Sequence, residues 1–90
     1  MLKCYVFSAQ IGSGISTKFL CIDESNVFEV PDDMTLAEAA TLPVVYMTAY
    51  YSLFVRGNLL PGEKVLIHAG SGGVGFAAIS ICKFRTFRIW

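Results

Sequence analysis

Hydrophobic residues in the second half of the chain follow a strand-then-helix order. Lys64–Ala69 contains a continuous apolar run, which is typical of a parallel strand buried on both faces of a sheet. After a glycine-rich stretch, apolar residues recur at helical spacing from Val74 to about Phe84. We therefore predict a central parallel strand over Lys64–Ala69, a glycine loop, and a helix over Val74–Phe84.

Two helix patterns precede this strand. Thr35 and Glu38 have the spacing of a capping box, which predicts a short helix that Pro43 ends. A second helix is predicted over Val44–Val55, with Gly57 as its left-handed C-terminal cap. The apolar residues on one side of that second helix are Val44, Met47, Tyr51, Phe54 and Val55.

Short extended segments and a turn complete the pattern. The pattern predicts strands over Tyr5–Ala9, Thr17–Ile22 and Val27–Val30, and Pro31 ends the last of them. Pro61-Gly62 predicts a type II turn, because proline presets φ at the second position and glycine accepts a positive φ at the third.

Composition sets the class of protein. The chain has 90 residues, of which 54% are apolar and 16% charged, and its formal net charge is zero. Average soluble domains are about 25% charged, so we expect apolar faces that further sequence covers, and we interpret the chain as a piece of a larger domain. The zero net charge argues against a nucleic-acid module, and the apolar content excludes disorder.

Membrane insertion and secretion are not predicted either. The longest apolar candidate, Pro43–Val55, is shorter than the roughly 18–20 residues that a membrane span needs. The first residues lack the apolar core of a signal peptide. Cys4, Cys21 and Cys82 are widely spaced and odd in number, which favours reduced thiols in the cytoplasm over disulfides or a metal site.

The glycine loop is the strongest chemical signal. Gly70-x-Gly72-x-x-Gly75 has the spacing of a dinucleotide-binding fingerprint and stands between the predicted strand and helix. We expect Gly70 to permit the tight turn, Gly72 to let a pyrophosphate approach the backbone, and Gly75 to let the helix pack closely. The helix N-terminus would offer N–H groups and partial positive charge to the phosphates.

Competing interpretations of this loop are weaker. A P-loop ends in Gly-Lys-Ser/Thr, whereas Phe76 follows Gly75 here. A nucleophile elbow needs Gly-x-Ser-x-Gly, and Ser71 lacks that spacing. Ser71 is therefore expected to be a loop hydroxyl that faces the phosphates. A purely structural glycine turn stays as the alternative.

Other polar residues have ordinary structural explanations. His68, the single histidine, is expected to be a core or loop residue rather than a catalytic base. The Thr48 hydroxyl is either a ligand contact or a donor to a carbonyl of its own helix. The cations Lys83, Arg85 and Arg88 are interpreted as a solvated end.

Several segments together resemble a known family. They are P-V-V-Y-M-T-A-Y-Y from Pro43, Arg56-Gly57, Leu60–Glu63, and L-I-H-A-G-S-G-G-V-G from Leu66 to Gly75. From about Thr17 to Cys82 the chain closely resembles the enoyl reductase domain of animal type I fatty acid synthase. Polyketide synthase reductases and quinone oxidoreductases of the same medium-chain dehydrogenase/reductase superfamily are looser matches.

This resemblance implies an α/β fold with a partial Rossmann-type unit of strand, glycine loop and helix, preceded by short β segments and two helices. Residues 1–30 would be a remnant of the β-rich, GroES-like substrate domain. Residues 31–85 would be the first part of the NADP-binding domain. The implied reaction is the NADPH-dependent reduction of the 2,3 double bond of an enoyl thioester on an acyl carrier domain, in fatty acid biosynthesis. The parent would be a cytoplasmic homodimer, without nucleic acid or membrane partners.

The resemblance also implies site residues. In this family the glycine loop holds the NADPH pyrophosphate, and the threonine of the T-A-Y-Y segment lies near the nicotinamide. The implied cofactor-binding residues are Thr48, Gly70, Ser71, Gly72, Gly73, Val74 and Gly75. The family's proton-donating Lys and Asp come after the loop and have no counterpart here, so no catalytic residue is assigned. No metal is implied.

Two positions depart from the family pattern. Phe76 stands where the family usually has Gln, and residues 86–90 do not show the usual glycine and second strand, so we interpret them as an aberrant tail. We expect the isolated chain not to reduce an enoyl thioester. The alternatives are a non-catalytic truncated product and another zinc-independent medium-chain reductase, of the quinone oxidoreductase or polyketide synthase type.

Overall fold

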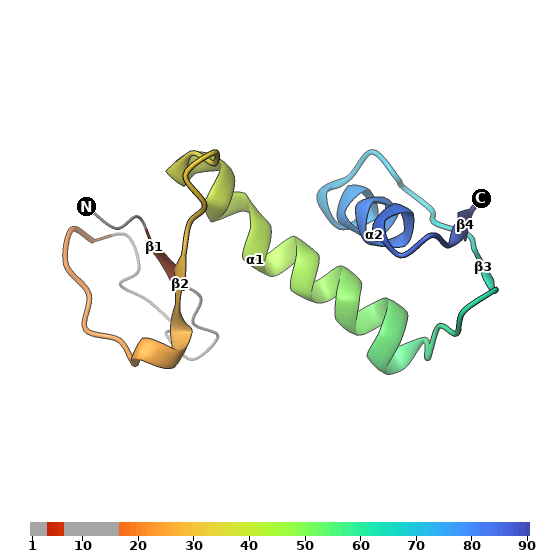
Figure 1. The fold of residues 1–90 in the computed structure, drawn as a ribbon, viewed down its shortest axis with the longest axis horizontal. Helices are drawn as coiled ribbons and strands as arrows, with labels where there is room; N and C mark the ends of the chain where they lie inside the picture. The colour runs from red at the N-terminus through yellow and green to blue at the C-terminus, as the bar shows by residue number, and fades with distance from the viewer. Residues whose placement is uncertain (1–3, 7–16) are drawn as a thin grey trace. The chain divides into compact units, whose positions relative to one another are not determined.

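The computed structural model describes residues 4–6 and 17–90 (Figure 1). The chain divides into two compact units, Met1–Thr41 and Leu42–Trp90, and each is described by itself.

In the first unit, a short antiparallel strand pair is the main sheet element. Strand β1 (Cys4–Val6) pairs with β2 (Val27–Glu29), with Tyr5 opposite Phe28. The described part of the predicted first strand is therefore confirmed, and its remaining residues lie outside the described ones. Extended structure is also confirmed within Val27–Val30.

The strand predicted over Thr17–Ile22 is wrong. These residues pair with no strand in the described structure, and most of their side chains are exposed, Phe19 to 89%. An apolar run gains strand structure only where a partner strand and a buried face are available. The polar turn that follows forms a 3₁₀ helix, η1 (Glu24–Asn26), in which the Asp23 carboxylate accepts the Ser25 N–H at 2.9 Å. This bond, donated by the backbone of Ser25, lowers the pKa of Asp23.

Helix α1 (Leu36–Tyr50) begins at the predicted capping box. The Glu38 carboxylate accepts the Thr35 N–H at 2.9 Å and its hydroxyl at 2.8 Å, and the Thr35 Oγ1 accepts the Glu38 N–H at 3.2 Å. These bonds, led by the Thr35 backbone N–H, lower the pKa of Glu38. The capping box is confirmed.

Pro43 was predicted to end this helix, but it lies inside it. A proline within a helix removes one backbone donor and crowds the carbonyl four residues earlier, but its fixed φ is close to the helical value. After Tyr50 the helix widens into a π-helical segment, η2 (Tyr51–Arg56), closed by the Gly57 N–H to the Ser52 carbonyl at 2.8 Å.

The predicted left-handed cap at Gly57 is also wrong. Gly57 has φ −78° and ψ −16°, in the right-handed region, and the positive φ of 48° falls on Asn58. The π-type closure carries right-handed backbone as far as Gly57, so the reversal comes at the next residue. Asparagine tolerates this conformation better than most residues with a side chain.

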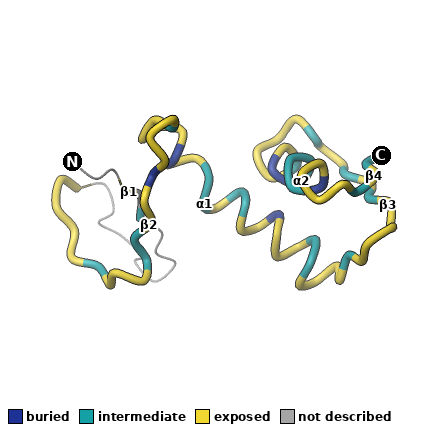
Figure 2. Tube along the Cα trace, viewed as in Figure 1, coloured by how far each residue is buried: buried dark blue, intermediate teal, exposed yellow. Residues whose placement is uncertain are grey.

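The side of α1 that faces the core of the second unit differs from the predicted one. Ala49 is buried against Ala77 and Ala78, with Val45 and Leu53 packed around them. Figure 2 marks buried positions on both α1 and α2 in dark blue. Four of the side chains predicted to form the apolar face are exposed, namely Val44, Met47, Tyr51 and Val55, and the fifth, Phe54, is half-buried. Alanines allow two helices to approach closely, and that contact determines which side is buried.

Strand β3 (Lys64–Val65) begins after a turn of the predicted type. Gly62 has φ 91°, and the Glu63 N–H donates to the Leu60 carbonyl at 3.2 Å. The Glu63 carboxylate accepts the Leu60 N–H at 2.7 Å. The type II turn is confirmed, because a positive φ at this position distinguishes type II from type I and glycine supplies that φ without strain.

A parallel β–α–β unit is formed by β3, α2 (Gly73–Phe84) and β4 (Arg88–Ile89). Lys64 pairs with Arg88, and further bonds extend the ladder: the Trp90 N–H donates to the Val65 carbonyl at 2.7 Å, and the Ile67 N–H donates to the Trp90 carbonyl at 3.1 Å. The α/β fold with parallel strands and the helix after the glycine loop are therefore confirmed.

This unit corrects two expectations. Residues 86–90 supply a second parallel strand, which the sequence pattern did not indicate. Strand β3 itself is shorter than the predicted Lys64–Ala69. It is also not a central strand in the described residues, because β4 is its one partner there. Leu66 is consequently 67% exposed. Two-sided burial requires more strands and covering helices than this sheet has.

The turn between α2 and β4 explains how the chain continues without the glycine usual at this point. The Phe87 N–H donates to the Cys82 carbonyl at 2.9 Å and the Thr86 N–H to the Lys83 carbonyl at 3.1 Å, which is the Schellman pattern. Thr86, at the position where glycine is preferred, has φ 61°. A β-branched residue is strained in this conformation.

Thr86→Gly is therefore expected to stabilise the chain by about 1 kcal/mol, because it removes the left-handed strain. The free energy of unfolding in urea, followed by circular dichroism, measures this effect. Thr86→Ala is the matched control: it removes the Thr86 hydroxyl bond to the Arg85 carbonyl but keeps the Cβ. Equal stabilities of the glycine and alanine variants would contradict the strain argument.

Candidate functional site

The glycine loop joins β3 to α2 by a compact turn. The Gly72 N–H donates to the Ala69 carbonyl at 3.0 Å, and the Gly72 carbonyl accepts the first helical bond, from the Phe76 N–H, at 2.8 Å. The positive φ of this turn, 54°, falls on Ala69. Gly70 was expected to permit the turn; instead, its missing Cβ leaves space for Ile79, whose Cδ1 would lie only 2.9 Å away.

Gly75 provides the close approach between helix and loop. A Cβ on Gly75 would lie 2.9 Å from the Ala69 carbonyl carbon and 2.9 Å from the Gly70 Cα, and closer still to the Ala69 carbonyl oxygen. These are backbone atoms that no side-chain rotation can move. The expectation that Gly75 lets the helix pack closely is therefore confirmed.

The space beside Gly72 is open. A Cβ on Gly72 would meet the Ala69 carbonyl oxygen at 3.4 Å, an ordinary contact, and nothing else within 4 Å. Its φ of −76° and ψ of 163° suit any residue. The fold itself therefore does not require glycine at position 72, and any such requirement must come from a molecule that approaches the loop.

The N-terminus of α2 has the features of an anion site. Its first backbone N–H groups have no acceptor within the helix, and no side chain caps it. No acidic residue occupies the first turn. Ser71, Gly73 and Val74 are exposed, and Phe76 is 61% exposed. The loop thus offers exposed donors and the positive end of a helix dipole to a negatively charged group.

The Thr48 hydroxyl bonds to a carbonyl of its own helix, which is the structural one of the two roles expected for it. Its Oγ1 donates to the Val44 carbonyl at 2.7 Å, and the residue is exposed. The start of α2 does lie near the preceding turn of α1, because a Cβ added to Gly73 would lie 3.1 Å from the Val45 Cγ1. The Thr48 oxygen still has acceptor capacity. Sequence reasoning missed Val45 and Ala69, since neither residue type signals a contact with a glycine loop.

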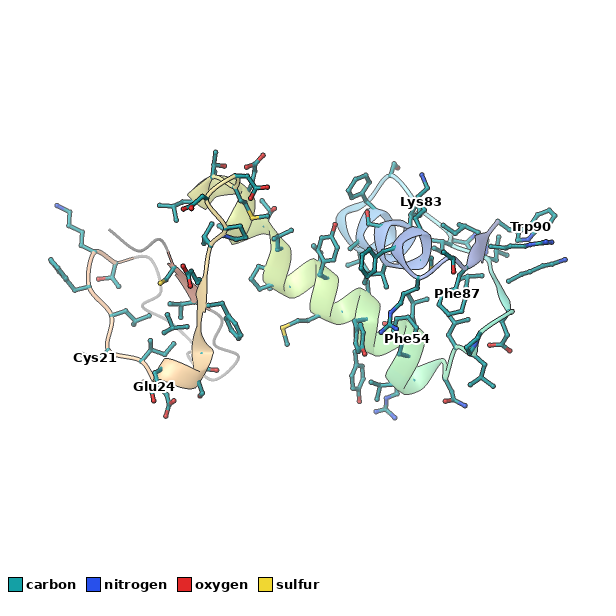
Figure 3. All side chains as sticks on the ribbon, viewed as in Figure 1. Cys21, Glu24, Phe54, Lys83, Phe87 and Trp90 are labelled. Carbon is teal, nitrogen blue, oxygen red and sulfur yellow. The ribbon has the colours of Figure 1, made fainter. Side chains whose placement is uncertain are left out.

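The remaining candidates supply no catalytic group. His68 was expected to be a core or a loop residue. It is an exposed loop residue, so the loop position is confirmed. Lys83 lies in the last turn of α2, at the opposite end of the helix from the glycine loop (Figure 3). Burial raises the pKa of the Cys82 thiol, which disfavours the nucleophilic thiolate.

The cysteines, the possible metal ligands and the helix lengths of the described residues also bear on what the site can hold. The cysteines Cys4, Cys21 and Cys82 are free thiols, as expected. Across residues 4–6 and 17–90, no group of His, Cys, Asp and Glu could hold a metal ion. In the same part of the chain, no helix combines the length and apolarity that a membrane crossing requires.

Comparison with curated proteins finds clear relatives, although no family model matches. The chain is 44% identical over 73 residues to the probable polyketide synthase 25 of Dictyostelium discoideum, covering 81% of this chain and 3% of that protein. It is 45% identical over 71 residues to the human synaptic vesicle membrane protein VAT-1 homolog, covering 79% of this chain and 18% of that protein. The chain thus spans less than a fifth of these relatives.

Solved structures agree with these relatives. CurK enoyl reductase superposes with a TM-score of 0.70 at 42% identity, covering 77% of this chain and 21% of that one. The CurF ER cyclopropanase from the curacin A biosynthetic pathway gives a TM-score of 0.66 at 38% identity, with the same coverage. The similar proteins thus include a named enoyl reductase, CurK, and a polyketide synthase, and they do not single out animal fatty acid synthase.

Proposed function

We propose that residues 31–85, continued by β4, form the first part of the dinucleotide-binding domain of an NADPH-dependent enoyl reductase. Residues 1–30 would be the remnant of its GroES-like domain. The observation that carries this proposal is the parallel β3–α2–β4 unit, with Gly75 against the loop backbone and open space beside Gly72. The relatives that share this segment are enoyl reductases, and enoyl reductases use nicotinamide cofactors.

The residues present fit a dinucleotide pyrophosphate. The exposed loop would hold it through the backbone N–H groups at the start of α2, with the Ser71 hydroxyl as a further donor. The residues proposed to bind the cofactor remain Thr48, Gly70, Ser71, Gly72, Gly73, Val74 and Gly75. When bound, NADPH supplies a hydride to the double bond of the substrate.

Charge supports NADPH over NADH. The unit Leu42–Trp90 contains five cationic residues and one acidic residue, Glu63. Arg88 is not the group that reads the ribose: it begins β4 opposite Lys64, the first residue of β3, at the far end of these parallel strands from the glycine loop. The net positive charge of this unit is what favours the additional phosphate of NADPH.

The proposed substrate is an enoyl thioester on an acyl carrier domain, which fatty acid and polyketide synthesis have in common. Polyketide synthases among the relatives support this chemistry. A cytoplasmic location and a homodimeric parent are part of the same proposal. A non-catalytic truncated product is the second candidate, favoured by the exposed apolar side chains of Val44 and Met47 on α1 and Val55 on η2.

Fluorescence titration of the chain with NADPH tests the proposal. We expect saturable binding of NADPH that is tighter than that of NADH, because the loop holds the pyrophosphate of both and the net positive charge of the unit Leu42–Trp90 favours the additional 2′-phosphate. The chain alone should not oxidise NADPH with a crotonyl thioester. Absence of binding to either cofactor would contradict the proposal.

A further inference from the structure

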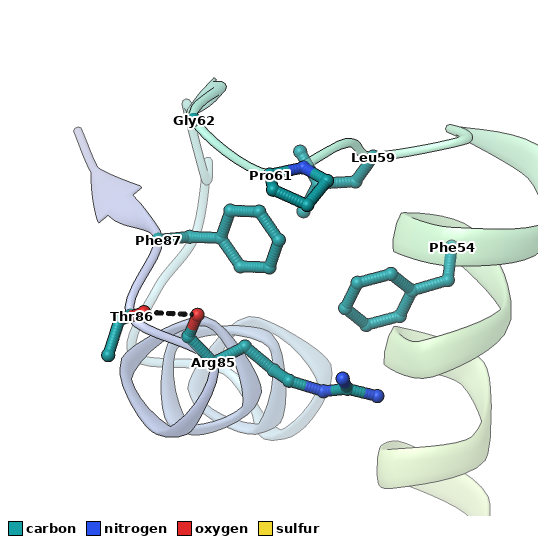
Figure 4. A pocket seen from close by; sticks show the side chains of 7 residues that line it. All are labelled: Phe54, Leu59, Pro61, Gly62, Arg85, Thr86 and Phe87. Carbon is teal, nitrogen blue, oxygen red and sulfur yellow. Dashed lines mark hydrogen bonds between the residues drawn. The ribbon is translucent and has the colours of Figure 1, made fainter.

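A second concave site lies at the end of α2 opposite the glycine loop. The cavity has a volume of about 280 Å³ and is formed within the unit Leu42–Trp90 (Figure 4). Three segments build it: the π-helical end of α1, the turn before β3, and the turn between α2 and β4. Its lining residues are Phe54, Leu59, Pro61, Gly62, Arg85, Thr86 and Phe87.

Aromatic rings and one guanidinium dominate this lining. The Phe54 and Phe87 ring centroids are 6.1 Å apart with an interplanar angle of 47°, and Figure 4 shows the two side chains pointing toward each other. The Arg85 Cζ lies 5.6 Å from the Phe54 ring centroid. A planar apolar group can therefore contact both rings while remaining close to a cation.

The surroundings favour an anion beside Arg85. From residue 64 to residue 90 the sequence contains no acidic residue. Glu63, next to the lining residue Gly62, has its carboxylate bonded to the Leu60 N–H. The last carbonyls of α2, which would repel an anion, are bonded instead: those of Ile81, Cys82 and Lys83 each accept a backbone N–H from residues 85–87.

From this arrangement we propose that the pocket binds a small aromatic carboxylate, with its ring against Phe54 and Phe87 and its carboxylate on the Arg85 guanidinium. The volume lies just below the about 300–1,000 Å³ of typical ligand pockets, so it suits a one- or two-ring molecule rather than a nucleotide. Planar, two-pronged recognition of a carboxylate is what an arginine side chain provides. This site is separate from the glycine loop and does not depend on the proposed reductase function.

Titration of the ¹⁵N-labelled 90-residue chain with 2-naphthoate, followed by NMR, tests the proposal. Saturable shifts are expected at Phe54, Leu59, Gly62 and residues 85–87, and not at the glycine loop. The neutral analogue 2-naphthamide should bind about tenfold more weakly, because it lacks the charge-assisted bond to the guanidinium.

A pair of arginine variants separates a specific site from general electrostatic attraction. Arg85→Gln should weaken 2-naphthoate binding about tenfold and leave 2-naphthamide binding unchanged. Arg56→Gln is the matched control: Arg56 stacks at the same 5.6 Å, on Tyr51, but does not line the pocket. Equal losses in the two variants, equal binding of the acid and the amide, or a spectrum lacking the β3–β4 signals would each overturn the proposal.

Discussion

Replacing Gly75 by alanine is expected to lower the free energy of unfolding by about 3 kcal/mol, although alanine is the better helix former. The added Cβ would lie 2.9 Å from two backbone atoms, the Ala69 carbonyl carbon and the Gly70 Cα. Backbone cannot rotate away as a side chain can, so the start of α2 must move away from the glycine loop. Ala77 and Ala78 of the same helix are buried against Ala49, and a displacement of α2 disturbs that contact as well. Urea unfolding followed by circular dichroism measures the loss.

Gly72→Ala is the matched control for this prediction. Its Cβ would meet the Ala69 oxygen at 3.4 Å, an ordinary contact, so a change within about 0.5 kcal/mol is expected. If the Gly75→Ala variant were as stable as the Gly72→Ala variant, the close approach of α2 to the loop backbone would be wrong.

Gly72→Val is expected to differ from Gly75→Ala in both properties: its stability should be near normal, and it should lose NADPH binding. The extended backbone of Gly72 suits a β-branched residue, and the space beside it is open within the chain. The valine side chain would occupy the volume through which the pyrophosphate must approach the loop. Losing two charge-assisted backbone bonds corresponds to at least about hundredfold weaker binding.

NADPH fluorescence titration and urea unfolding of the same Gly72→Val sample separate these effects. Ser71→Ala is the companion variant: it removes one exposed loop hydroxyl without adding volume, and should weaken binding only several-fold. Unchanged NADPH affinity in Gly72→Val would mean that the glycine loop is purely structural.

Features that depend on a few neighbouring residues could be predicted from the sequence. The Thr35–Glu38 capping box closes within four residues, and the turn at Gly62 needs only its own φ. The order of strand, glycine loop and helix was likewise predictable. The family resemblance added the cofactor and the reaction, which the residue pattern by itself did not specify.

Features that depend on distant partners were not predictable. The apolar side of α1 was wrongly assigned because burial follows the contact of Ala49 with Ala77 and Ala78, whose small side chains carry little weight in a hydrophobic pattern. The strand in residues 86–90 was missed because Thr86 occupies the position where a glycine usually marks the turn. The Phe54–Arg85–Phe87 pocket joins three separate segments, and no spacing rule connects them.

The sequence by itself determined the local conformations and the presence of a phosphate-type loop, because short-range sterics and capping bonds act between residues that are always neighbours. Only the tertiary structure decided that Gly75 is required by the fold while Gly72 is not, since both are glycines of one motif and differ solely in what a Cβ would meet. It also decided that β4 pairs with β3 and that the Arg85 guanidinium lies beside the Phe54 ring. Such contacts depend on the packing of elements that are far apart in the chain, and no local pattern encodes them.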